Sequence, residues 1–132
     1  MVVARQRGEE RMIAGVGLDV VGVDRTSRLL ARHGGRLFER CFTAGEVARP
    51  GDAEHVAGLL AAKEAAFKAL GTGWGDGVGW RDVAVERTPS GGPRLRLAGG
   101  AAARAAALGV RATHVSITHA AGVAIAVVIL EA

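Results

Sequence analysis

The hydrophobic and polar positions of this 132-residue chain fall into segments with strand-like or helix-like spacing. The stretch MIAGVGLDVV is apolar and spaced by glycines, which predicts a buried strand over residues 13–21. Further along, apolar residues recur at intervals of three and four, which predicts a long helix with one buried face. Asp52 is placed to cap this helix, which we expect to end near Leu70 because Gly71 follows as a C-terminal stop.

Capping residues, turns and periodicity predict the other elements. In chain order they are a helix from Asp24 to about His33 that ends at Gly34-Gly35, a short helix opened by the capping-box residues Thr43 and Glu46, strands over 80–87 and 94–98, a helix over 100–108, and strands over 112–119 and 122–130. The resulting order, β-α-α-α-β-β-α-β-β, indicates an α+β fold with a mixed or antiparallel sheet. We expect one domain over residues 12–132 and a loose extension over residues 1–11, which show no periodicity.

The bulk composition restricts the partners and the location. A net charge of +4 and an isoelectric point near 10.5 favour an anionic partner, which leaves nucleic acid, a phosphorylated small molecule or an acidic protein. No apolar run approaches the ~20 residues that span a membrane, so we expect no membrane partner. Cys41 is the only cysteine, which excludes an internal disulfide and favours a cytoplasmic protein.

Asp19 stands inside the first predicted strand, among apolar residues. A buried carboxylate is costly unless it is paired or binds a metal. Asp19 is therefore a candidate metal ligand. The alternative is an ordinary carboxylate near a strand end that caps a neighbouring group or pairs with an arginine.

The segment KEAAFK contains both lysines of the chain, whose 17 basic residues are otherwise all arginine. On the long helix, Lys63 falls in the middle of the apolar stripe, and Glu64 and Lys68 share a neighbouring side lined by alanines. An ammonium group binds phosphate and also gives up a proton, which a guanidinium effectively cannot do. The segment therefore points to phosphate chemistry with a leaving group that needs a proton. Three alternatives stay open: a surface pair of Glu64 and Lys68, a Lys63 side chain that extends to solvent, and chance.

The stretch HVSITH places His114, Ser116 and Thr118 on one strand face and His119 at the strand end. A serine hydrolase is disfavoured because Ser116 lies within a strand and not on a sharp exposed turn. A zinc site is disfavoured because the two histidines lack a third placed ligand. These polar groups are better suited to hydrogen-bonding a phosphate or a partner loop. The glycine-rich loop over residues 71–79 lacks the lysine and hydroxyl of a P-loop and is a weak signal alone.

Taken together, these segments resemble the holo-[acyl-carrier-protein] synthase family of short 4'-phosphopantetheinyl transferases. GVGLDVVGVDR resembles the family element G-x-D-x(5)-R, and LFERCFTAGE resembles its F-T-x-x-E segment. AAKEAAFKALGTG resembles the signature K-E-A-x-x-K-A-x-G-T-G, while GGPRLRL and HVSITHAAGVAIAVVIL resemble the hairpin and the last two strands. The resemblance extends over residues 13–131 and implies the transferase fold of this family, with a long central helix packed on a mostly antiparallel sheet.

The resemblance also implies a function, namely transfer of 4'-phosphopantetheine from coenzyme A to a serine of apo acyl carrier protein, with release of adenosine 3',5'-bisphosphate. It implies that Asp19 and Glu64 hold Mg²⁺, which prefers oxygen ligands and shares its coordination with phosphates. Lys68 would balance charge on the leaving group or protonate it. Coenzyme A would be bound by the family positions Lys63, Lys68, Gly71, Gly73, Thr118 and His119. Relatives of this short form are homotrimers with active sites between subunits, and we expect the same here.

A basic face on the first helix is the expected docking surface for the carrier protein. Arg25, Arg28 and Arg32 follow each other at intervals of three and four. In the family, the first helix docks against the acidic recognition helix of the carrier. Arg25 matches the family motif, and Arg28 and Arg32 follow from helical spacing. The alternative is a solvated basic surface without a partner.

Two positions depart from the family pattern. Leu59 and Leu60 stand where the family usually has Arg-Phe, so one expected basic contact to coenzyme A is missing or is supplied by another arginine. Ala120 follows the last histidine, where some relatives have an acidic residue, which excludes a simple His-Asp pair. A family member that has lost activity is therefore one alternative. Another is a basic module that binds nucleic acid or a phosphoprotein, but it explains neither Asp19 nor Glu64, and stacking aromatics are scarce. We therefore expect no nucleic acid partner, and the resemblance leaves open whether the carrier serves fatty-acid or polyketide synthesis.

Overall fold

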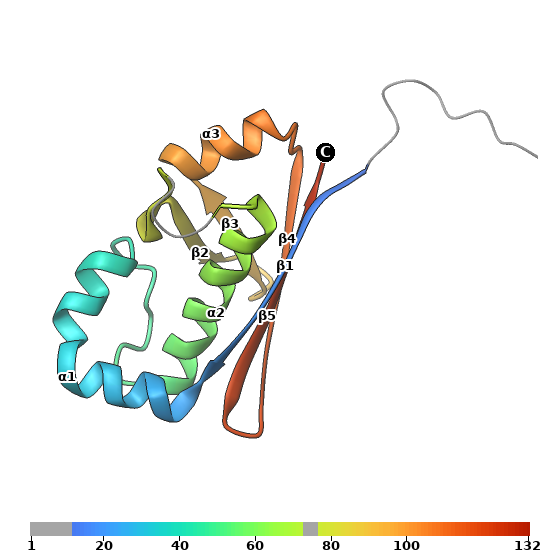
Figure 1. The fold of residues 1–132 in the computed structure, drawn as a ribbon. Helices are drawn as coiled ribbons and strands as arrows, with labels where there is room; N and C mark the ends of the chain where they lie inside the picture. The colour runs from blue at the N-terminus through green and yellow to red at the C-terminus, as the bar shows by residue number, and fades with distance from the viewer. Residues whose placement is uncertain (1–11, 73–76) are drawn as a thin grey trace, which may run out of the picture.

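A computed structural model describes residues 12–72 and 77–132 of the protein (Figure 1). The helices and strands are β1 (Ile13–Gly22), α1 (Val23–Cys41), α2 (Ala53–Leu70), a short 3-10 helix η1 (Trp80–Asp82), β2 (Val83–Arg87), β3 (Pro93–Leu97), α3 (Gly99–Ala107), β4 (Ala112–Ala120) and β5 (Val123–Glu131). The predicted loose extension over residues 1–11 lies outside the described residues. Within the described part of the chain, no helix is long and apolar enough to cross a membrane.

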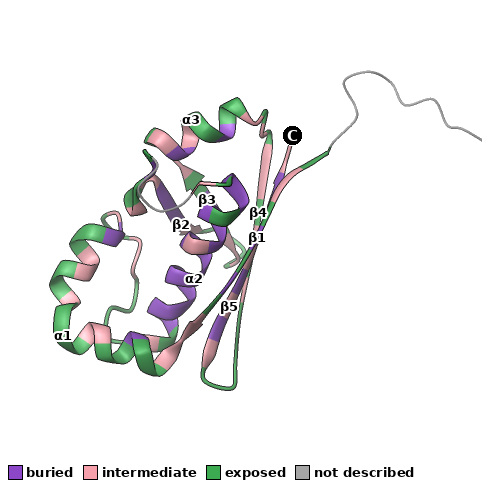
Figure 2. Ribbon diagram, in the orientation of Figure 1, coloured by how far each residue is buried: buried purple, intermediate pink, exposed green. Residues whose placement is uncertain are grey.

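The helix α2 is the centre of the fold and lies against one face of a three-stranded antiparallel sheet (Figure 1). The strand order is β1-β5-β4, so β5 pairs with both of its neighbours. Alternate residues of β5 are buried on the α2 side, namely Ala124, Ala126, Val128 and Leu130. Figure 2 shows that most of α2 is buried, whereas α1 is largely exposed. The predicted α+β fold with a long central helix on an antiparallel sheet is therefore confirmed.

Glycines bring β1 into direct contact with the backbone of α2. A Cβ added to Gly15 would lie 1.9 Å from the carbonyl oxygen of Ala69, and a Cβ added to Gly17 would lie 1.7 Å from that of Ala65. No residue with a side chain fits at these distances. Because side chains alternate between the two faces of a strand, Asp19 lies on the same face as Gly17 and is presented to α2.

Both ends of α2 are capped as the sequence predicts. At the N-terminus, Asp52 Oδ1 accepts hydrogen bonds from the backbone N–H groups of Glu54 and His55, at 3.1 and 3.2 Å. At the C-terminus, Gly71 adopts a left-handed conformation with a φ of 68°. Arg104 of α3 also donates a hydrogen bond from Nε to the carbonyl oxygen of Leu70 at 2.9 Å. A terminal carbonyl group of the helix thereby gains a partner.

The first helix is longer than predicted. It begins one residue before Asp24, which lies in the first turn and does not cap the helix. The backbone of His33 is non-helical, with a φ of −136° and a ψ of 17°, but α1 bends there and runs on to Cys41. Leu37 and Phe38 pack against the core beyond the bend, which explains why the two glycines do not end the helix. The helix α1 therefore consists of two segments joined at the bend, and the second segment lies before the position where the second helix was predicted.

The predicted short helix that starts at Thr43 is wrong, because the chain forms a turn there. Glu46 Oε1 does accept the backbone N–H of Thr43 at 3.0 Å, as in a capping box. The same carboxylate also accepts the backbone N–H of Val85 in β2 at 2.9 Å and pairs with Lys63 of α2. These distant partners hold the segment against β2 and α2, so a helix does not continue from it.

Candidate active site

Asp19, Glu64 and Lys68 come together where β1 meets the second half of α2. Lys68 Nζ lies 3.0 Å from Asp19 Oδ1 and donates another hydrogen bond to the carbonyl oxygen of Leu18 at 3.1 Å. The Asp19 side chain is only 10% exposed, whereas that of Lys68 is 58% exposed. Lys68 therefore links α2 to β1 and keeps its ammonium group accessible from solvent.

The carboxyl groups of Asp19 and Glu64 interact directly. Burial raises the pKa of Glu64 to about 7, and a hydrogen bond and the negative charge of Asp19 add to this shift, while the positive charges of Lys68 and Arg25 oppose it. Asp19 Oδ2 is buried and has no hydrogen-bond partner among the described residues. Two adjacent carboxyl groups with an orphaned oxygen form a donor set that suits a hard divalent cation.

The number and type of ligands in this cluster distinguish between zinc and magnesium as the bound metal. No group of three or more His, Cys, Asp or Glu side chains that could hold a metal occurs within residues 12–72 and 77–132. Zinc sites use at least three protein ligands. Mg²⁺ is usually held by one or two carboxylates together with water and substrate phosphates. The pair of Asp19 and Glu64 therefore fits Mg²⁺ shared with a phosphorylated substrate.

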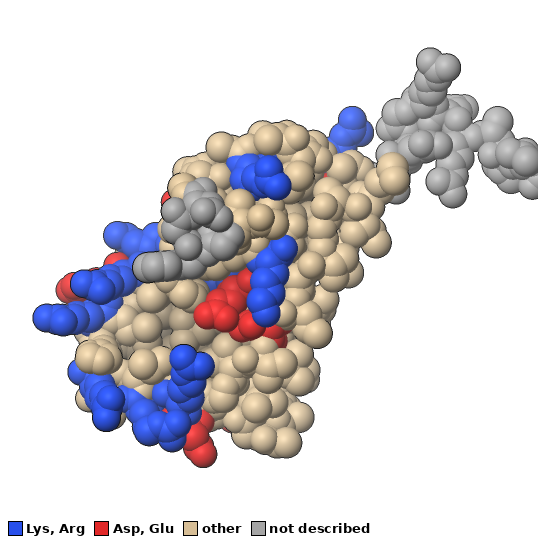
Figure 3. All heavy atoms as spheres, in the orientation of Figure 1, with Lys and Arg blue, Asp and Glu red and all other residues tan. Residues whose placement is uncertain are grey.

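Charged side chains surround this cluster on the surface. Figure 3 shows acidic atoms on one face of the molecule, with Lys and Arg side chains on both sides of them. Arg25, Arg28 and Arg32 are exposed on the first part of α1. Of these three, Arg25 lies near enough to Glu64 for its charge to lower the pKa of that carboxyl. The predicted basic face thus begins beside the acidic cluster.

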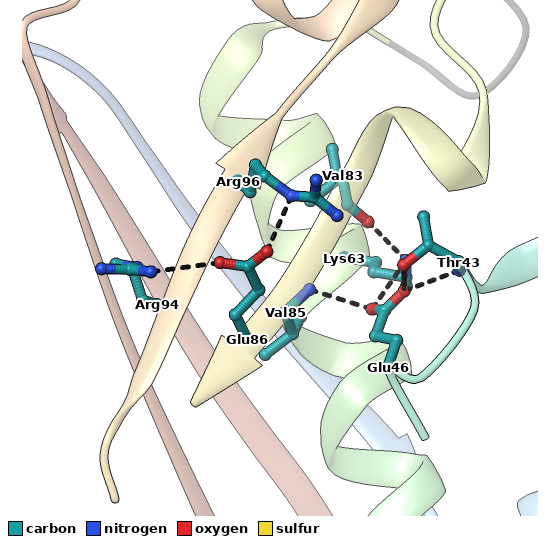
Figure 4. Close-up of polar contacts among 8 residues, drawn as sticks. All are labelled: Thr43, Glu46, Lys63, Val83, Val85, Glu86, Arg94 and Arg96. Carbon is teal, nitrogen blue, oxygen red and sulfur yellow. Dashed lines mark hydrogen bonds and ion pairs between the residues drawn. The ribbon is translucent and has the colours of Figure 1, made fainter. Parts of the chain in front are cut away.

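Lys63 does not belong to this cluster. Its side chain is fully buried at 0% exposure, and Nζ lies 2.9 Å from Glu46 Oε2 (Figure 4). The ammonium group also donates hydrogen bonds to the carbonyl oxygens of Trp80, at 3.1 Å, and Val83, and lies 5.0 Å from the centre of the Phe42 ring. Every donor of this ammonium group has a partner inside the protein, so the structure gives Lys63 internal contacts in place of an open position for coenzyme phosphates.

A groove of about 740 Å³ lies along the first half of α2. Its walls come from the turn before α2, from the β2–β3 hairpin and from the end of β4. Its basic and aromatic lining residues are Arg49, His55, Arg87, Arg96 and His119, and its apolar lining includes Leu59, Val85, Pro93 and Ile117. Basic side chains beside an apolar surface suit a ligand with a phosphate and a flat ring.

The remaining predicted positions lie in different places. His119 lines the groove, where its Nε2 lies 3.0 Å from the carbonyl oxygen of Glu54. Thr118 precedes it on β4 and is exposed on the opposite face of the sheet. Gly71 ends α2, close to Lys68 and away from the groove. Gly73 lies outside the described residues.

Sequence reasoning missed the roles of several residues that line the groove. Glu46 was singled out as a capping residue and as part of the F-T-x-x-E segment, but not as the acidic partner that a buried Lys63 requires. Arg49, Arg87 and His55 carried no local signal, because they meet in the groove from three separate elements. Leu59 lines the same groove, so other arginines lie near the position where the family usually has one.

Comparison with known proteins places these features in a family. The model of the 4'-phosphopantetheinyl transferase superfamily matches residues 15–128. A holo-[acyl-carrier-protein] synthase of Nitratidesulfovibrio vulgaris is 50% identical over 123 residues, which cover 91% of this chain and 99% of that protein. The predicted resemblance is therefore confirmed.

Solved structures agree with this result. The Helicobacter pylori holo-[acyl-carrier-protein] synthase in complex with coenzyme A has a TM-score of 0.78 and 29% identity, over 87% of this chain and 98% of that chain. The Bacillus anthracis holo-(acyl-carrier-protein) synthase in complex with CoA (3',5'-ADP) has a TM-score of 0.73 and 32% identity, over 91% of this chain and 97% of that chain.

Proposed function

Because the chain belongs to the 4'-phosphopantetheinyl transferase superfamily, we propose that it transfers 4'-phosphopantetheine from coenzyme A to a serine of apo acyl carrier protein. The serine Oγ forms a bond to the phosphorus that carries pantetheine, and the bond from that phosphorus to the bridging oxygen breaks. Adenosine 3',5'-bisphosphate leaves with that oxygen. The observation that carries this proposal is the cluster of Asp19, Glu64 and Lys68, which combines a site for a divalent cation with an accessible ammonium group.

We propose that Asp19 and Glu64 hold Mg²⁺ in this cluster. The orphaned Asp19 Oδ2 and the adjacent Glu64 carboxyl support this assignment. When bound, the cation neutralises charge on the pyrophosphate of coenzyme A. Binding the cation requires Glu64 to lose its proton, so Glu64 is ionised in the working enzyme.

Lys68 is the proposed partner of the leaving group. Its Nζ now lies 3.0 Å from Asp19, and its side chain is 58% exposed, so it can turn from Asp19 toward a phosphate in solvent. An ammonium group balances the developing charge on the departing bisphosphate and can donate a proton to it. The proton of the attacking serine hydroxyl passes to solvent water.

The nucleotide end of coenzyme A is proposed to occupy the groove, with the adenine on the apolar surface and the 3'-phosphate near Arg49, Arg87 and His119. The groove residues in the described part of the chain do not include Asp19, Glu64 or Lys68. We propose that a molecule that uses both regions binds where they face each other across two subunits. The proposed assembly is the homotrimer that the family resemblance implies, with active sites between subunits.

The sheet supplies a surface for such an assembly. Val16, Leu18 and Val20 on β1 are each 56% exposed, on the face that α2 does not cover. Ile125, Val127 and Ile129 of β5 continue this apolar surface. An apolar surface of this kind is typical of a protein–protein contact. Analytical ultracentrifugation of the purified protein tests the trimer, and a monomer at micromolar concentration would contradict it.

We also propose that residues 12–132 form the single transferase domain and that the protein acts in the cytoplasm. One core that contains α2, β5 and the hairpin supports a single domain. The free, buried thiol of Cys41 is compatible with a reducing compartment. A variant that begins at Met12 should retain the transfer activity of the full chain.

Incubation with coenzyme A, Mg²⁺ and an apo carrier protein tests the function, because mass spectrometry of the carrier detects the added phosphopantetheine. Asp19→Ala should remain folded and transfer at least 100-fold more slowly, since it removes a group that stabilises transition-state charge. If the protein binds coenzyme A but modifies no carrier, it is an inactive member of the family. The observation that favours this alternative is Leu59, which lines the groove where the family usually has an arginine. If the protein binds neither coenzyme A nor the carrier, it is the basic binding module.

A further inference from the structure

His55 occupies an unusual position in the wall of the groove. It lies in the first turn of α2, is only 8% exposed and lines the groove. Its backbone N–H is used by Asp52 Oδ1, but its side-chain Nε2 is buried and has no hydrogen-bond partner among the described residues. A buried ring nitrogen without a partner is uncommon in a folded protein. The role of His55 is therefore not explained by the packing of α2.

The groups that face His55 come from each element around it. Burial lowers the pKa of His55, and the charges of Arg49 before α2, Arg87 at the end of β2 and His119 at the end of β4 lower it further. Asp52 alone acts in the opposite direction. Burial and mostly positive surroundings thus disfavour the protonated form of His55. An anion placed among these groups would reverse that balance.

Two of the acidic side chains that line the groove are paired with basic side chains. Glu46 is neutralised by Lys63 (Figure 4). Glu86 pairs with Arg96 at 2.7 Å and with Arg94 at 3.2 Å. Glu54 also lines the groove, but it is exposed and its charge is not among the influences on the pKa of His55. Among residues 12–72 and 77–132, Asp52 is the carboxylate whose charge favours a protonated His55.

Arg87 differs from the other arginines of the groove. Arg49 pairs with Asp52 and Arg96 pairs with Glu86. Arg87 donates from Nη1 to the carbonyl oxygen of Gly91 at 2.9 Å and has no carboxylate partner among residues 12–72 and 77–132. It therefore brings an uncompensated positive charge to the groove, which attracts an anion to the neighbourhood of His55.

We propose that His55 takes up a proton from solvent when a phosphate group occupies the groove, so that His55 makes the affinity for the phosphorylated ligand depend on pH. This inference rests on the proposed function, because the phosphorylated ligand is then the nucleotide end of coenzyme A. The proton adds to the free ring nitrogen, and no other bond forms or breaks. The resulting imidazolium gains in the phosphate the partner that the protein does not supply.

Adenosine 3',5'-bisphosphate is a suitable probe, since it contains the phosphates without the reacting pantetheine arm. NMR titration of the four histidines, in the free protein and at saturating probe, reports each protonation separately. We expect the pKa of His55 to rise by at least one unit on binding, while those of His33 and His114 stay unchanged. By linkage, a shift of one unit strengthens binding about tenfold at low pH relative to high pH.

Calorimetry in buffers of different ionisation enthalpy gives an independent count of protons taken up on binding. His55→Gln should abolish the part of the uptake that exceeds the titration of the probe itself. His33→Gln is the matched control, because His33 is exposed on α1 outside the groove, and it should behave as the natural chain. If His55→Gln does not fold, the NMR titration of the natural chain decides alone.

The outcomes separate this inference from the proposed function. If the probe binds and the pKa of His55 does not move, or moves less than that of His119, the inference is wrong and the proposed function stands. If His55→Gln takes up as many protons as the natural chain, the inference is also wrong. If the probe does not bind at all, both proposals fail.

Discussion

Gly17 of β1 lies so close to Ala65 of α2 that a Cβ on Gly17 would be 1.7 Å from the Ala65 carbonyl oxygen. Ala65 directly follows Glu64, and Asp19 is the next residue of β1 on the same face as Gly17. The absence of a side chain at Gly17 therefore determines how near the carboxyl of Asp19 comes to that of Glu64. The metal-binding geometry of the cluster depends on this contact between strand and helix.

Replacing Gly17 with alanine tests this relationship. The added methyl group must push β1 away from α2, so we expect a loss of stability of about 3 kcal/mol or more, at the upper end of overpacking effects. Urea unfolding measures this loss. Gly35→Ala is the matched control, since nothing lies within 4 Å of a Cβ there, and it should be neutral or slightly stabilising. Equal stability of the two variants would contradict the close packing of β1 on α2.

The buried pair of Lys63 and Glu46 allows a second test. Lys63→Met leaves the Glu46 carboxylate buried without its cation, which should cost about 3–5 kcal/mol of stability in urea unfolding. Adding Glu46→Gln removes the uncompensated charge and should recover part of this loss. The exposed pair of Glu86 and Arg94 is the control, because Arg94→Ala should cost at most about 1 kcal/mol. A small effect of Lys63→Met would contradict the structural role of this pair.

The two ends of α2 could be predicted because short-range rules determine them: Asp52 caps backbone N–H groups within three residues, and Gly71 adopts a left-handed conformation. The prediction of a short helix at Thr43 was wrong because the conformation of this segment depends on Glu46. The main partner of Glu46 is Lys63, which lies 17 residues away in the sequence. Local sequence rules do not contain such contacts.

The candidate site shows the same limit. The apolar stripe predicted a special position for Lys63, and the family motif predicted the carboxylates Asp19 and Glu64. The environment of His55 was not predictable, because Arg87 and His119 reach it only through the pairing of β2 and β4 with the rest of the fold. Non-local packing thus decided what motif and periodicity left open.

The raised pKa of Glu64 predicts how stability depends on pH in the metal-free protein. Between its ordinary value of 4.5 and the folded value of about 7, the unfolded chain has released the proton that the folded chain still holds. Raising the pH through this window therefore favours unfolding, and the free energy of unfolding should fall between about pH 4.5 and pH 7. Urea unfolding with EDTA at pH 5 and pH 8 measures this decrease.

Glu64→Gln serves as the control for this dependence, because glutamine does not titrate. The decrease between pH 5 and pH 8 should be smaller in this variant than in the natural chain. Adding Mg²⁺ at pH 8 should stabilise the natural chain and not the variant, since a cation that binds only the folded state raises its stability. If Mg²⁺ stabilises both proteins equally, Glu64 is not a ligand.

Lys68→Arg separates charge from proton donation at the leaving group. Arginine keeps the positive charge near Asp19 but effectively cannot give up a proton. Because general acid catalysis contributes about 10²–10⁴-fold, we expect kcat to fall at least 100-fold with a nearly unchanged KM for coenzyme A. Steady-state assays with the carrier protein measure both constants. Activity close to that of the natural chain would leave Lys68 with an electrostatic role only.

The exposed arginines of α1 predict how the carrier protein is recruited. Arg28 and Arg32 lie on the first segment of α1, beyond Arg25, whose charge reaches Glu64. Reversing both to glutamate should raise the KM for carrier roughly tenfold at low salt, because each exposed pair adds ~0.2–1 kcal/mol and reversal adds repulsion. The KM for coenzyme A should stay nearly the same. In the natural chain, the KM for carrier should rise with salt, since screening weakens long-range attraction.

A matched pair of substitutions distinguishes the position of these charges from their number. Arg36 and Arg40 are also exposed on α1 but lie beyond the bend at His33, so they belong to the second helical segment. Reversing Arg36 and Arg40 changes the net charge by the same amount and should alter the KM for carrier far less than reversing Arg28 and Arg32. If the two double variants lose carrier affinity equally, attraction depends on net charge and not on a docking face. If neither changes carrier kinetics at low salt, the carrier docks elsewhere and these arginines form only a solvated surface.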